Sequence, residues 1–320
     1  MTVSPIMKPP LLRVASCVNH MNAIGFLKRT LRSSEAIFRE LLYDLSPLLL
    51  VEYLYIQQTG RIFHPKDPRT FDQKVLWLML YWRNPLKARC ADKYAVRSYV
   101  EENGLGHLLP ESLGVYSNSR EIDFDKLPGR FVLKCTHGSG FNIFCLDKSR
   151  FDIAEARRRL DGWMKKDISK LGGEIHYASI KPRIICVEFL GDRFGKPPMD
   201  YKVYCFDGRA HCTMVCTDRG QGTTKYDFYD LEWKNVLRYC RPGSSSNRDI
   251  PKPEAYEVMI DAAERLSKPF PFVRVDFYSI RGKAVFGEMT FTPSGGIDMD
   301  LTDTAQDTMG QLIRLPGKLV

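Results

Sequence analysis

Short apolar runs, rich in β-branched and aromatic residues, dominate the chain from residue 131 to residue 291, and turns separate them. The runs are FVLKCT (131–136), NIFCLD (142–147), RIICVEFL (183–190), YKVYCFDG (201–208), AHCTMVCT (210–217), VRVDFYSI (273–280) and KAVFGEMTF (283–291). Only two helical stretches, Asp152–Lys170 and Lys252–Leu266, lie between them. Parallel strands need a helix-sized crossover between neighbours, and two helices are too few. The pattern predicts an α+β fold with antiparallel sheets, in lobes that join near Lys181–Leu190.

The chain before these runs has helical patterning. Residues 1–60 are expected to be helical, with a start near Ser33–Ser34 and a stop at Gly60. Thr70 is expected to cap a helix over Phe71–Trp82 with an apolar face.

Three further signals refine this helical part. Pro85 should end the helix that starts after Thr70, and a second helix is expected over Asp92–Asn103, closed by Gly104. The most apolar segment, Leu41–Ile56, contains charges and a proline. It is too interrupted for a membrane-spanning helix of roughly 20 apolar residues, so we expect a helix that is buried or lies on a membrane surface.

Charge and cysteine content limit the partners and the compartment. The net charge of +9 favours anionic partners, but the basic residues are scattered and not interleaved with exposed aromatics, which argues against nucleic acid. Nine cysteines form no CxxC pair. This content predicts a reduced, cytoplasmic protein without structural zinc, and leaves open a peripheral association with the inner face of the membrane.

A glycine-rich loop follows the strand-like run that ends in Lys134. The loop contains His137, Gly138, Ser139 and Gly140, and glycine lets backbone N–H groups approach a phosphate closely. An ordinary glycine hairpin with a surface lysine would have the same sequence. His137 could contact a phosphate or a carboxylate substrate, or it could be a structural loop residue.

Two carboxylates flank a tight turn near the carboxyl end. Asp276 and Glu288 lie on successive runs around Arg281–Gly282, so a hairpin would bring them together. Such hard oxygen ligands bind Mg²⁺ together with substrate phosphates. Arg274 should share a face with Asp276, where its guanidinium suits a carboxylate or an acyl-phosphate. The alternative is a surface hairpin with alternating charges.

Further charged residues lie between the loop and this hairpin. Glu188 follows an apolar run, and Asp200 and Lys202 should share one face of the next strand. Together with Lys134 they provide cations for phosphates and acids for a metal, while the glycine loop could act as a lid.

In this order, the residues resemble the ATP-grasp superfamily. The segments TFDQKVLWL, ADKYAVRSYV, KCTHGSG, DYKVYCFDG and GEMTFTPSGG together resemble its TupA-like branch, which is associated with teichuronopeptide and other surface-polysaccharide biosynthesis. The resemblance covers roughly residues 50–300. It implies an ATP-grasp fold in which two α+β lobes grip ATP and Mg²⁺. The expected division is an N-terminal helical region (1–90), a small lobe with the glycine loop (91–187) and a large lobe with the metal site (188–320).

The resemblance also implies roles for single residues. ATP would be bound by Lys93, Lys134, His137, Gly138, Ser139, Gly140, Val187, Glu188, Phe189, Leu190, Asp200 and Lys202; magnesium by Asp276, Glu288 and Thr290; and the chemistry would involve Arg274, Lys202 and His137. Within these sets, Val187–Leu190 would hold the adenine. Most ATP-grasp enzymes have Asn where this chain has Thr290, which puts the second metal position in question.

The function expected from the resemblance is an ATP-dependent carboxylate–amine ligase. It would phosphorylate a carboxylate, such as a uronic acid of a glycan, and join the acyl-phosphate to an amine such as an amino acid. We expect the acceptor in segment 215–250. Two alternatives remain: a sugar kinase or a glycosyltransferase, for which Asp298-Met299-Asp300 offers a short DxD match, and a non-catalytic nucleotide-binding scaffold in a polysaccharide-assembly complex.

Overall fold

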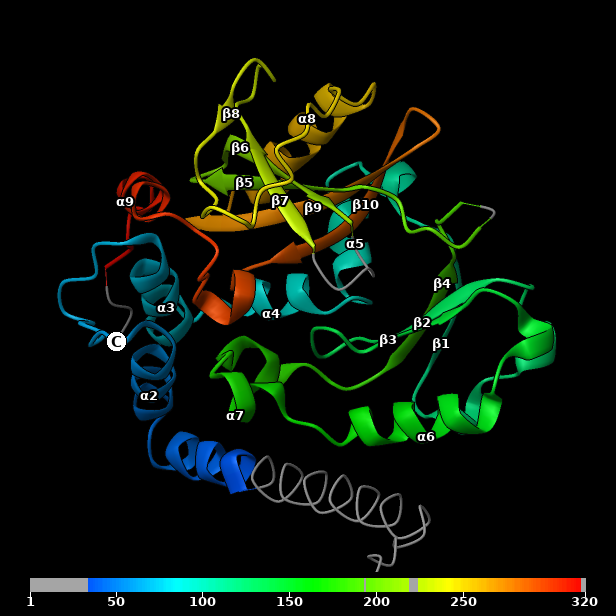
Figure 1. Ribbon diagram of the computed structural model, residues 1–320. Helices are drawn as coiled ribbons and strands as arrows, with labels where there is room; N and C mark the ends of the chain where they lie inside the picture. The colour runs from blue at the N-terminus through cyan, green and yellow to red at the C-terminus, as the bar shows by residue number, and fades with distance from the viewer. Residues whose placement is uncertain (1–33, 193, 219–223, 318–320) are drawn as a thin grey trace, which may run out of the picture.

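Two antiparallel sheets hold the strands of the protein in a computed structural model, which describes residues 34–192, 194–218 and 224–317 (Figure 1). The small sheet has the order β1-β4-β2-β3, with β1 at Ser112–Tyr116, β2 at Phe131–Cys135, β3 at Asn142–Cys145 and β4 at Ile184–Glu188. The large sheet has the order β10-β9-β5-β6-β7-β8, with β5 at Asp200–Phe206, β6 at Arg209–Thr217, β7 at Lys225–Tyr229, β8 at Val236–Leu237, β9 at Phe272–Ile280 and β10 at Lys283–Thr290. The α+β class and the antiparallel sheets are confirmed.

Three of these strands were not expected from the sequence. β1 contains Gly114 and is only partly buried, so it lacks an apolar run. β7 and β8 lie at one edge of the large sheet, where the edge strand β8 is short, with Val236 exposed and Leu237 half-buried. Edge strands need less apolar surface than central ones, and periodicity detects them poorly.

The helices are more numerous than the sequence suggested. Residues 34–45 are helical, and they are followed by α2 (Pro47–Thr59), α3 (Phe71–Tyr81), α4 (Pro85–Ala91), α5 (Val96–Glu102), α6 (Ile153–Met164), α7 (Ile168–Gly172), α8 (Tyr256–Ser267) and α9 (Asp303–Leu312). Short 3₁₀ helices are η1 (Gly106–Leu108), η2 (Ser119–Glu121), η3 (Phe124–Lys126), η4 (Lys148–Arg150), η5 (Ile175–Ser179) and η6 (Pro293–Gly296).

Helix α3 starts where the sequence placed it. The Gln73 N–H donates to the Thr70 hydroxyl at 3.4 Å, and the Gln73 side chain accepts from the Thr70 N–H at 3.5 Å, which closes a capping box. However, residues 75–80 are all buried, because α3 packs between two core clusters. A helix enclosed on both sides needs no polar face.

Two expected helices differ in extent because aspartates start new turns within them. The Asp92 side chain accepts from the N–H groups of Tyr94 and Ala95, so α5 begins only at Val96. Asp167 accepts from the Ser169 N–H at 2.9 Å, which starts α7 and separates it from α6. Pro85 was expected only as a stop and instead begins α4.

The N-terminal helices share a core with the large sheet. The ring of Phe71, at the start of α3, lies 4.9 Å from the ring of Phe272 and 6.1 Å from that of Tyr204. The same cluster includes buried residues of α4, α5, α8 and α9. This packing fixes the turn after α4 beside β10, where the candidate site lies. The lobe boundaries at residues 91 and 188 stay predictions.

The apolar segment Leu41–Ile56 is divided between the interior and the surface. α2 buries Leu50, Val51 and Leu54, whereas Leu45 and Leu49 are exposed. No helix within the described ranges is long and apolar enough to cross a membrane. Residues 1–33, including the start expected at Ser33, lie outside the described residues.

Candidate active site

A cleft between the two sheets collects most of the charged residues that the sequence singled out. Its predicted lining residues are Lys93, Lys134, Val187, Asp200, Lys202, Asp276 and Glu288. The sequence reasoning missed Arg97, Asn142, Ile185, Tyr278, Phe286 and Gly287, which also line it. These residues belong to no recognisable sequence motif, so only the structure identifies them as lining the cleft. Asn142, two residues after the last glycine of the loop, had the best available signal.

A bulge in the β9–β10 hairpin brings the two carboxylates opposite each other. Arg281 and Gly282 both have positive φ, so Lys283 pairs with Ile280 across a two-residue turn. Regular pairing from that turn would place Gly287 opposite Asp276. The register instead shifts between Phe286 and Glu288, and Glu288 faces Asp276.

Glycine at position 287 makes this bulge possible. A Cβ there would lie 2.9 Å from the carbonyl oxygen of Asp276, closer than real contacts allow. The sequence predicted that the carboxylates would be neighbours, but the bulge decides the register in which they meet.

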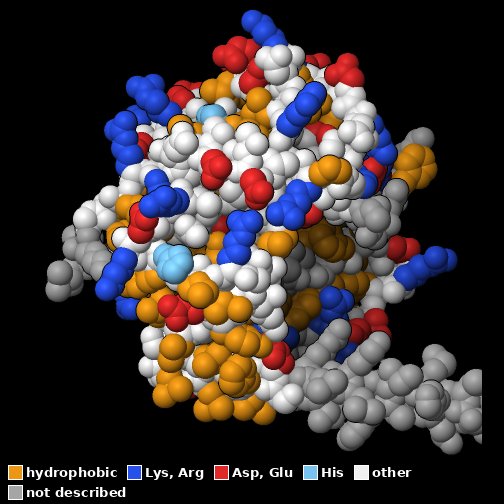
Figure 2. Space-filling view, turned by 60° about the vertical axis from the view of Figure 1, so that its left-hand side comes forward, with side chains coloured by type: hydrophobic (Ala, Val, Ile, Leu, Met, Phe, Trp, Pro, Cys, Tyr) orange, Lys and Arg blue, Asp and Glu red, His pale blue; other side chains and the backbone are white. Residues whose placement is uncertain are grey.

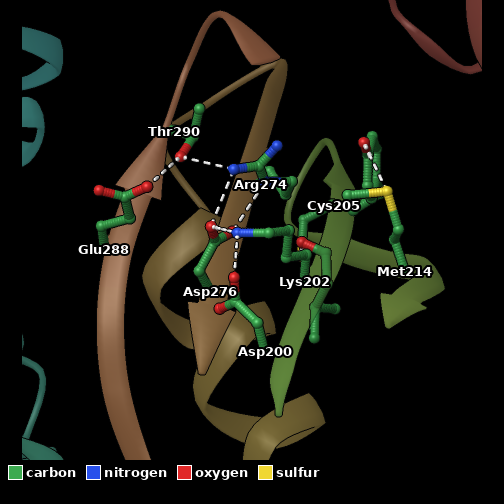
Figure 3. A network of polar contacts seen from close by, with 10 residues as sticks. Asp200, Lys202, Cys205, Met214, Arg274, Asp276, Glu288 and Thr290 are labelled. Carbon is green, nitrogen blue, oxygen red and sulfur yellow. Dashed lines mark hydrogen bonds and ion pairs between the residues drawn. The ribbon is translucent and has the colours of Figure 1, made fainter. Parts of the chain in front are cut away.

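Asp276 is the centre of a buried ion-pair network (Figure 3). Its carboxylate accepts from the Nε and Nη2 atoms of Arg274 at 2.7 and 2.8 Å and contacts the Lys202 ammonium. Lys202 also lies 2.9 Å from Asp200. Asp276 is 2% exposed, and Lys202 and Arg274 are 8% exposed. Charges so far from water persist only when they are paired.

The network continues to the second carboxylate. Arg274 Nη2 donates to the Thr290 hydroxyl at 3.2 Å, and that hydroxyl lies 3.5 Å from Glu288 Oε1 (Figure 3). Burial would raise the pKa of Glu288, but the surrounding cations, among them Lys93, Lys202 and Arg274, lower it to about 2. Glu288 is therefore ionised at physiological pH, as a metal ligand must be.

The cleft has the chemistry that a nucleotide requires. Lys93, Lys134 and Lys202 converge on it from the turn after α4, from β2 and from β5. Asn142 Oδ1 is buried and has no hydrogen-bond partner in the described part of the chain, so it can accept from a bound base or ribose. The cations match phosphates, and the orphaned acceptor matches a ligand donor.

Magnesium also fits this donor set. No group of three or more His, Cys, Asp or Glu side chains in the described residues could hold a metal ion. Mg²⁺ bound with nucleotide phosphates takes only one or two protein carboxylates and fills its other positions with phosphate oxygens and water. Asp276 and Glu288, with the Thr290 hydroxyl, match such a site.

The glycine loop is held to the turn after α4. The Lys93 ammonium donates to the Gly138 carbonyl at 2.5 Å. A Cβ on Gly138 would lie 2.8 Å from Ile168, which explains the need for glycine there. Ser139 and Gly140 are exposed at the tip.

His137 does not line the cleft. Its ring is 3% exposed, its Nε2 lies 3.1 Å from the Trp163 carbonyl, and it contacts the ring of Phe141. Burial lowers its pKa, so the imidazole is neutral at pH 7. This geometry favours the structural alternative for His137, and the catalytic role predicted for it stays untested.

The residues expected to hold the adenine follow β4. Val187 lines the cleft, but the Glu188 carboxylate accepts from the backbone N–H of Glu111 at 2.8 Å and so ties the end of β4 to the segment before β1. Phe189 lies under the guanidinium of Arg130, at 4.4 Å. Neither side chain reaches into the cleft, and Leu190 does not line it. Of the four residues, only Val187 therefore has a side chain placed to contact adenine, and any contact from the other three would come from the backbone.

A second cavity of about 270 Å³ adjoins the first and shares Lys202 and Glu288 with it. Residues from β6, β7 and the segments after β7 and β10 line it, among them Cys216, Tyr226, Cys240, Arg274, Ser294, Asp298 and Asp300. Several fall within segment 215–250. The two aspartates of the DxD match therefore line the same cavity as Arg274 and Ser139 of the glycine loop, whereas Lys93 and Lys134 line the first cleft.

This architecture, a cleft between two antiparallel sheets with lysines from both and paired carboxylates on one, defines the class of ATP-grasp proteins. A family model for TupA-like ATP-grasp proteins matches residues 73–314. The chain belongs to the TupA-like ATP-grasp family.

Solved structures provide further likenesses. The chain is similar to D-alanine–D-alanine ligase from Bacillus anthracis complexed with ATP, with 13% identity, a TM-score of 0.44, and coverage of 70% of this chain and 64% of that one. It is similar to an L-amino acid ligase from Bacillus licheniformis, with 13% identity, a TM-score of 0.41, and coverage of 75% and 53%. It is also similar to D-cycloserine synthetase DcsG, with 14% identity, a TM-score of 0.40, and coverage of 71% of this chain and 70% of that one.

The chain covers less than two thirds of the length of the first two of these proteins. A search of the curated proteins found no match.

Proposed function

We propose that this protein is an ATP-dependent, magnesium-dependent ligase that joins a carboxylate to an amine through an acyl-phosphate. The observation that carries the proposal is the convergence of Lys93, Lys134, Lys202 and Arg274 on Glu288, which faces Asp276. Four cations around two carboxylates suit a polyphosphate with its divalent ion.

Each side chain has a distinct task in this proposal. Lys93 and Lys134 hold the nucleotide phosphates, while Lys202 and Arg274 stabilise the charge that develops on the transferred phosphoryl group. Asp276, Glu288 and Thr290 hold magnesium, which neutralises phosphate charge when bound. Asp276 also keeps Lys202 and Arg274 aligned before substrate arrives, because it contacts both.

The reaction has two steps. An oxygen of the substrate carboxylate attacks the γ-phosphorus of ATP, and ADP leaves. The neutral amine then attacks the acyl carbon, inorganic phosphate leaves, and the amine nitrogen loses a proton as the amide forms. The cavity beside Arg274 is the proposed place for both substrates, because it adjoins the nucleotide cleft at Lys202 and Glu288.

We further propose that the carboxylate belongs to a uronic acid of a surface polysaccharide and that the amine is an amino acid. The TupA-like family assignment and the net charge of +9 support an acidic glycan as substrate. Figure 2 shows hydrophobic side chains gathered at the base of the molecule, over the N-terminal helices. Ile37, Leu41 and Leu45 are exposed there, which supports a peripheral association with an assembly at the inner face of the membrane.

The test is ADP release from Mg²⁺-ATP with uronic-acid glycans and pooled amino acids, for the wild type, Lys134→Ala and Glu288→Ala. Release that needs both a carboxylate and an amine, and that disappears in both variants, would support the ligase. Release that needs a hydroxyl acceptor would favour a kinase, and transfer from a sugar nucleotide would favour a glycosyltransferase, for which Asp298 and Asp300 are in place beside the cavity. ATP binding without turnover would favour a scaffold, and no ATP binding would contradict the whole proposal.

A further inference from the structure

A third cavity, of about 460 Å³, lies against α2, α3 and α9. Its lining is strongly acidic: Asp72, Asp298, Asp303 and Asp307 contribute carboxylates. Arg61 and Arg241 are the cations in its lining. The Arg241 Nε donates to the Leu301 carbonyl at 3.0 Å, so part of that guanidinium is already engaged with backbone. The carboxylates outnumber the guanidinium groups, and the cavity favours a cation.

Asp72 supplies an acceptor that the protein does not satisfy. Its side chain is 5% exposed, and its Oδ2 accepts from Gln306 Nε2 at 2.7 Å and from the Asp298 N–H at 3.3 Å. Its Oδ1 is buried and has no partner in the described part of the chain. An unmet buried carboxylate oxygen is unfavourable, and an N–H donor from a ligand would relieve it.

The kind of cation follows from the spacing of the acids. No group of three or more acidic, His or Cys side chains in the described ranges is placed to hold a metal ion. An ammonium makes fewer geometric demands, because its N–H groups donate separately to oxygens around it. Burial also raises the pKa of Asp72 to about 7, and a bound ammonium would favour its ionised form.

Asp298 connects this acidic cavity with the proposed reaction centre. It lines the acidic cavity and also the cavity that contains Arg274 and Glu288. The two cavities are therefore neighbours, with the Asp298 side chain in the lining of each. Among the residues that the structure describes, no other lines both cavities.

We propose that the amine substrate is a diamino compound, whose reacting amine lies beside Arg274 and whose second, protonated amino group is bound in the acidic cavity by Asp72, Asp298, Asp303 and Asp307. This inference rests on the proposed ligase function. It names the class of amine that the proposed ligase site takes. It predicts that the protein prefers amines with a second, protonated amino group over amines that lack one.

The test is calorimetry on the full chain with Mg²⁺ and a non-hydrolysable ATP analogue. The probes are L-lysine and L-ornithine, each compared with the amino acid of the same carbon chain that lacks the side-chain ammonium, L-norleucine and L-norvaline. At least one diamino probe should bind about tenfold or more tightly than its neutral counterpart, as charge-assisted hydrogen bonds predict. The double variant Asp303→Asn/Asp307→Asn should reduce this preference severalfold, since it removes two of the four carboxylates. Both side chains are exposed, so the changes spare the core.

Asp261→Asn, an exposed change on α8, is the matched control and should keep the preference. Three results would overturn the inference, provided that the protein binds the ATP analogue: equal affinity for charged and neutral probes, absence of binding for all of them, or a preference that is unchanged in the double variant. Loss of analogue binding in the wild type would instead contradict the ligase proposal, so the two failures can be told apart.

Discussion

Lys202 and Asp276 are paired opposite each other on β5 and β9, and their charged groups are in contact inside the protein. Because Asp200 also lies against Lys202, this one ammonium serves two buried carboxylates. We expect Lys202→Met to lower the free energy of unfolding by about 3 kcal/mol, since the buried carboxylates of Asp200 and Asp276 lose the ammonium that both contact, while Arg274 still pairs with Asp276. Urea unfolding of the apo-protein measures this.

Lys252→Met is the control for that change, because the Lys252–Glu257 pair lies at the surface. Exposed pairs contribute little, so the control should shift the unfolding midpoint much less. Equal shifts in the two variants would show that Lys202 does not hold the network together.

The bulge at Gly287 should be essential for turnover. In Gly287→Ala the new Cβ meets the Asp276 carbonyl, so β10 must move and Glu288 leaves its position opposite Asp276. We expect ADP release to fall by about a hundredfold, as for other small displacements of catalytic groups. Gly129→Ala, where a Cβ would meet nothing within 4 Å, should leave the rate unchanged. A rate in Gly287→Ala like that of the control would mean that this register is not needed.

Thr290 and Glu288 should affect the magnesium requirement in opposite directions. Thr290→Asn replaces a weak hydroxyl ligand by an amide oxygen, whereas Glu288→Gln removes a charge. We expect the Mg²⁺ concentration for half-maximal ADP release to fall in Thr290→Asn and to rise roughly tenfold in Glu288→Gln, equivalent to about 1.4 kcal/mol. Unchanged magnesium titrations in both variants would place the metal elsewhere.

The free energy of unfolding should fall as the pH rises from 4.5 to about 7, because of the buried carboxyl of Glu174. Burial raises its pKa from 4.5 to about 7, although the Thr292 hydroxyl donates to it. The folded state thus binds this proton more tightly than the unfolded state. The contribution is complete below pH 4.5 and is lost as pH rises to about 7.

The measurement is the free energy of unfolding against pH, for the wild type and Glu174→Gln. Between those two pKa values Glu174 should add a decline of up to about 1.4 kcal/mol per pH unit, and the glutamine variant should lack that part. Identical slopes would mean that Glu174 is ionised in the folded protein.

His137 should matter for stability rather than for chemistry. His137→Phe keeps a ring beside Phe141 but loses the bond to the Trp163 carbonyl. We expect a lower melting temperature and, for the folded fraction, ADP release within about threefold of the wild type. A loss of a hundredfold or more, with the fold intact, would show that His137 is an acid–base catalyst after all, since that is about the contribution of such groups.

The sequence predicted the central strands well, because they are short runs rich in β-branched and aromatic residues and are bounded by turns. β5, for example, is buried along its whole length and was expected within two residues of its observed limits. It also predicted Thr70 as the cap of α3, since a cap acts within one turn, and the structure adds the reciprocal contact of Gln73. Features of this kind depend only on residues that are close together in the sequence.

The sequence could not predict what depends on distant partners. Leu45 and Leu50 look alike in the chain, yet one is exposed and the other is buried by helices far along the sequence. Asn142 became a candidate ligand residue only when its oxygen proved to be buried without a partner.

For the site itself, the sequence determined which residues supply its chemistry: the lysines, the arginine and the two hairpin carboxylates are recognisable as motifs. The tertiary structure decided which of them meet. It placed Glu288 opposite Asp276 through a bulge, turned His137 away from the cleft, and gathered Asp72 and Asp298 around one acidic cavity. The physical reason is that charge type is a property of each residue, whereas register, burial and distance arise only when segments far apart in the chain pack together.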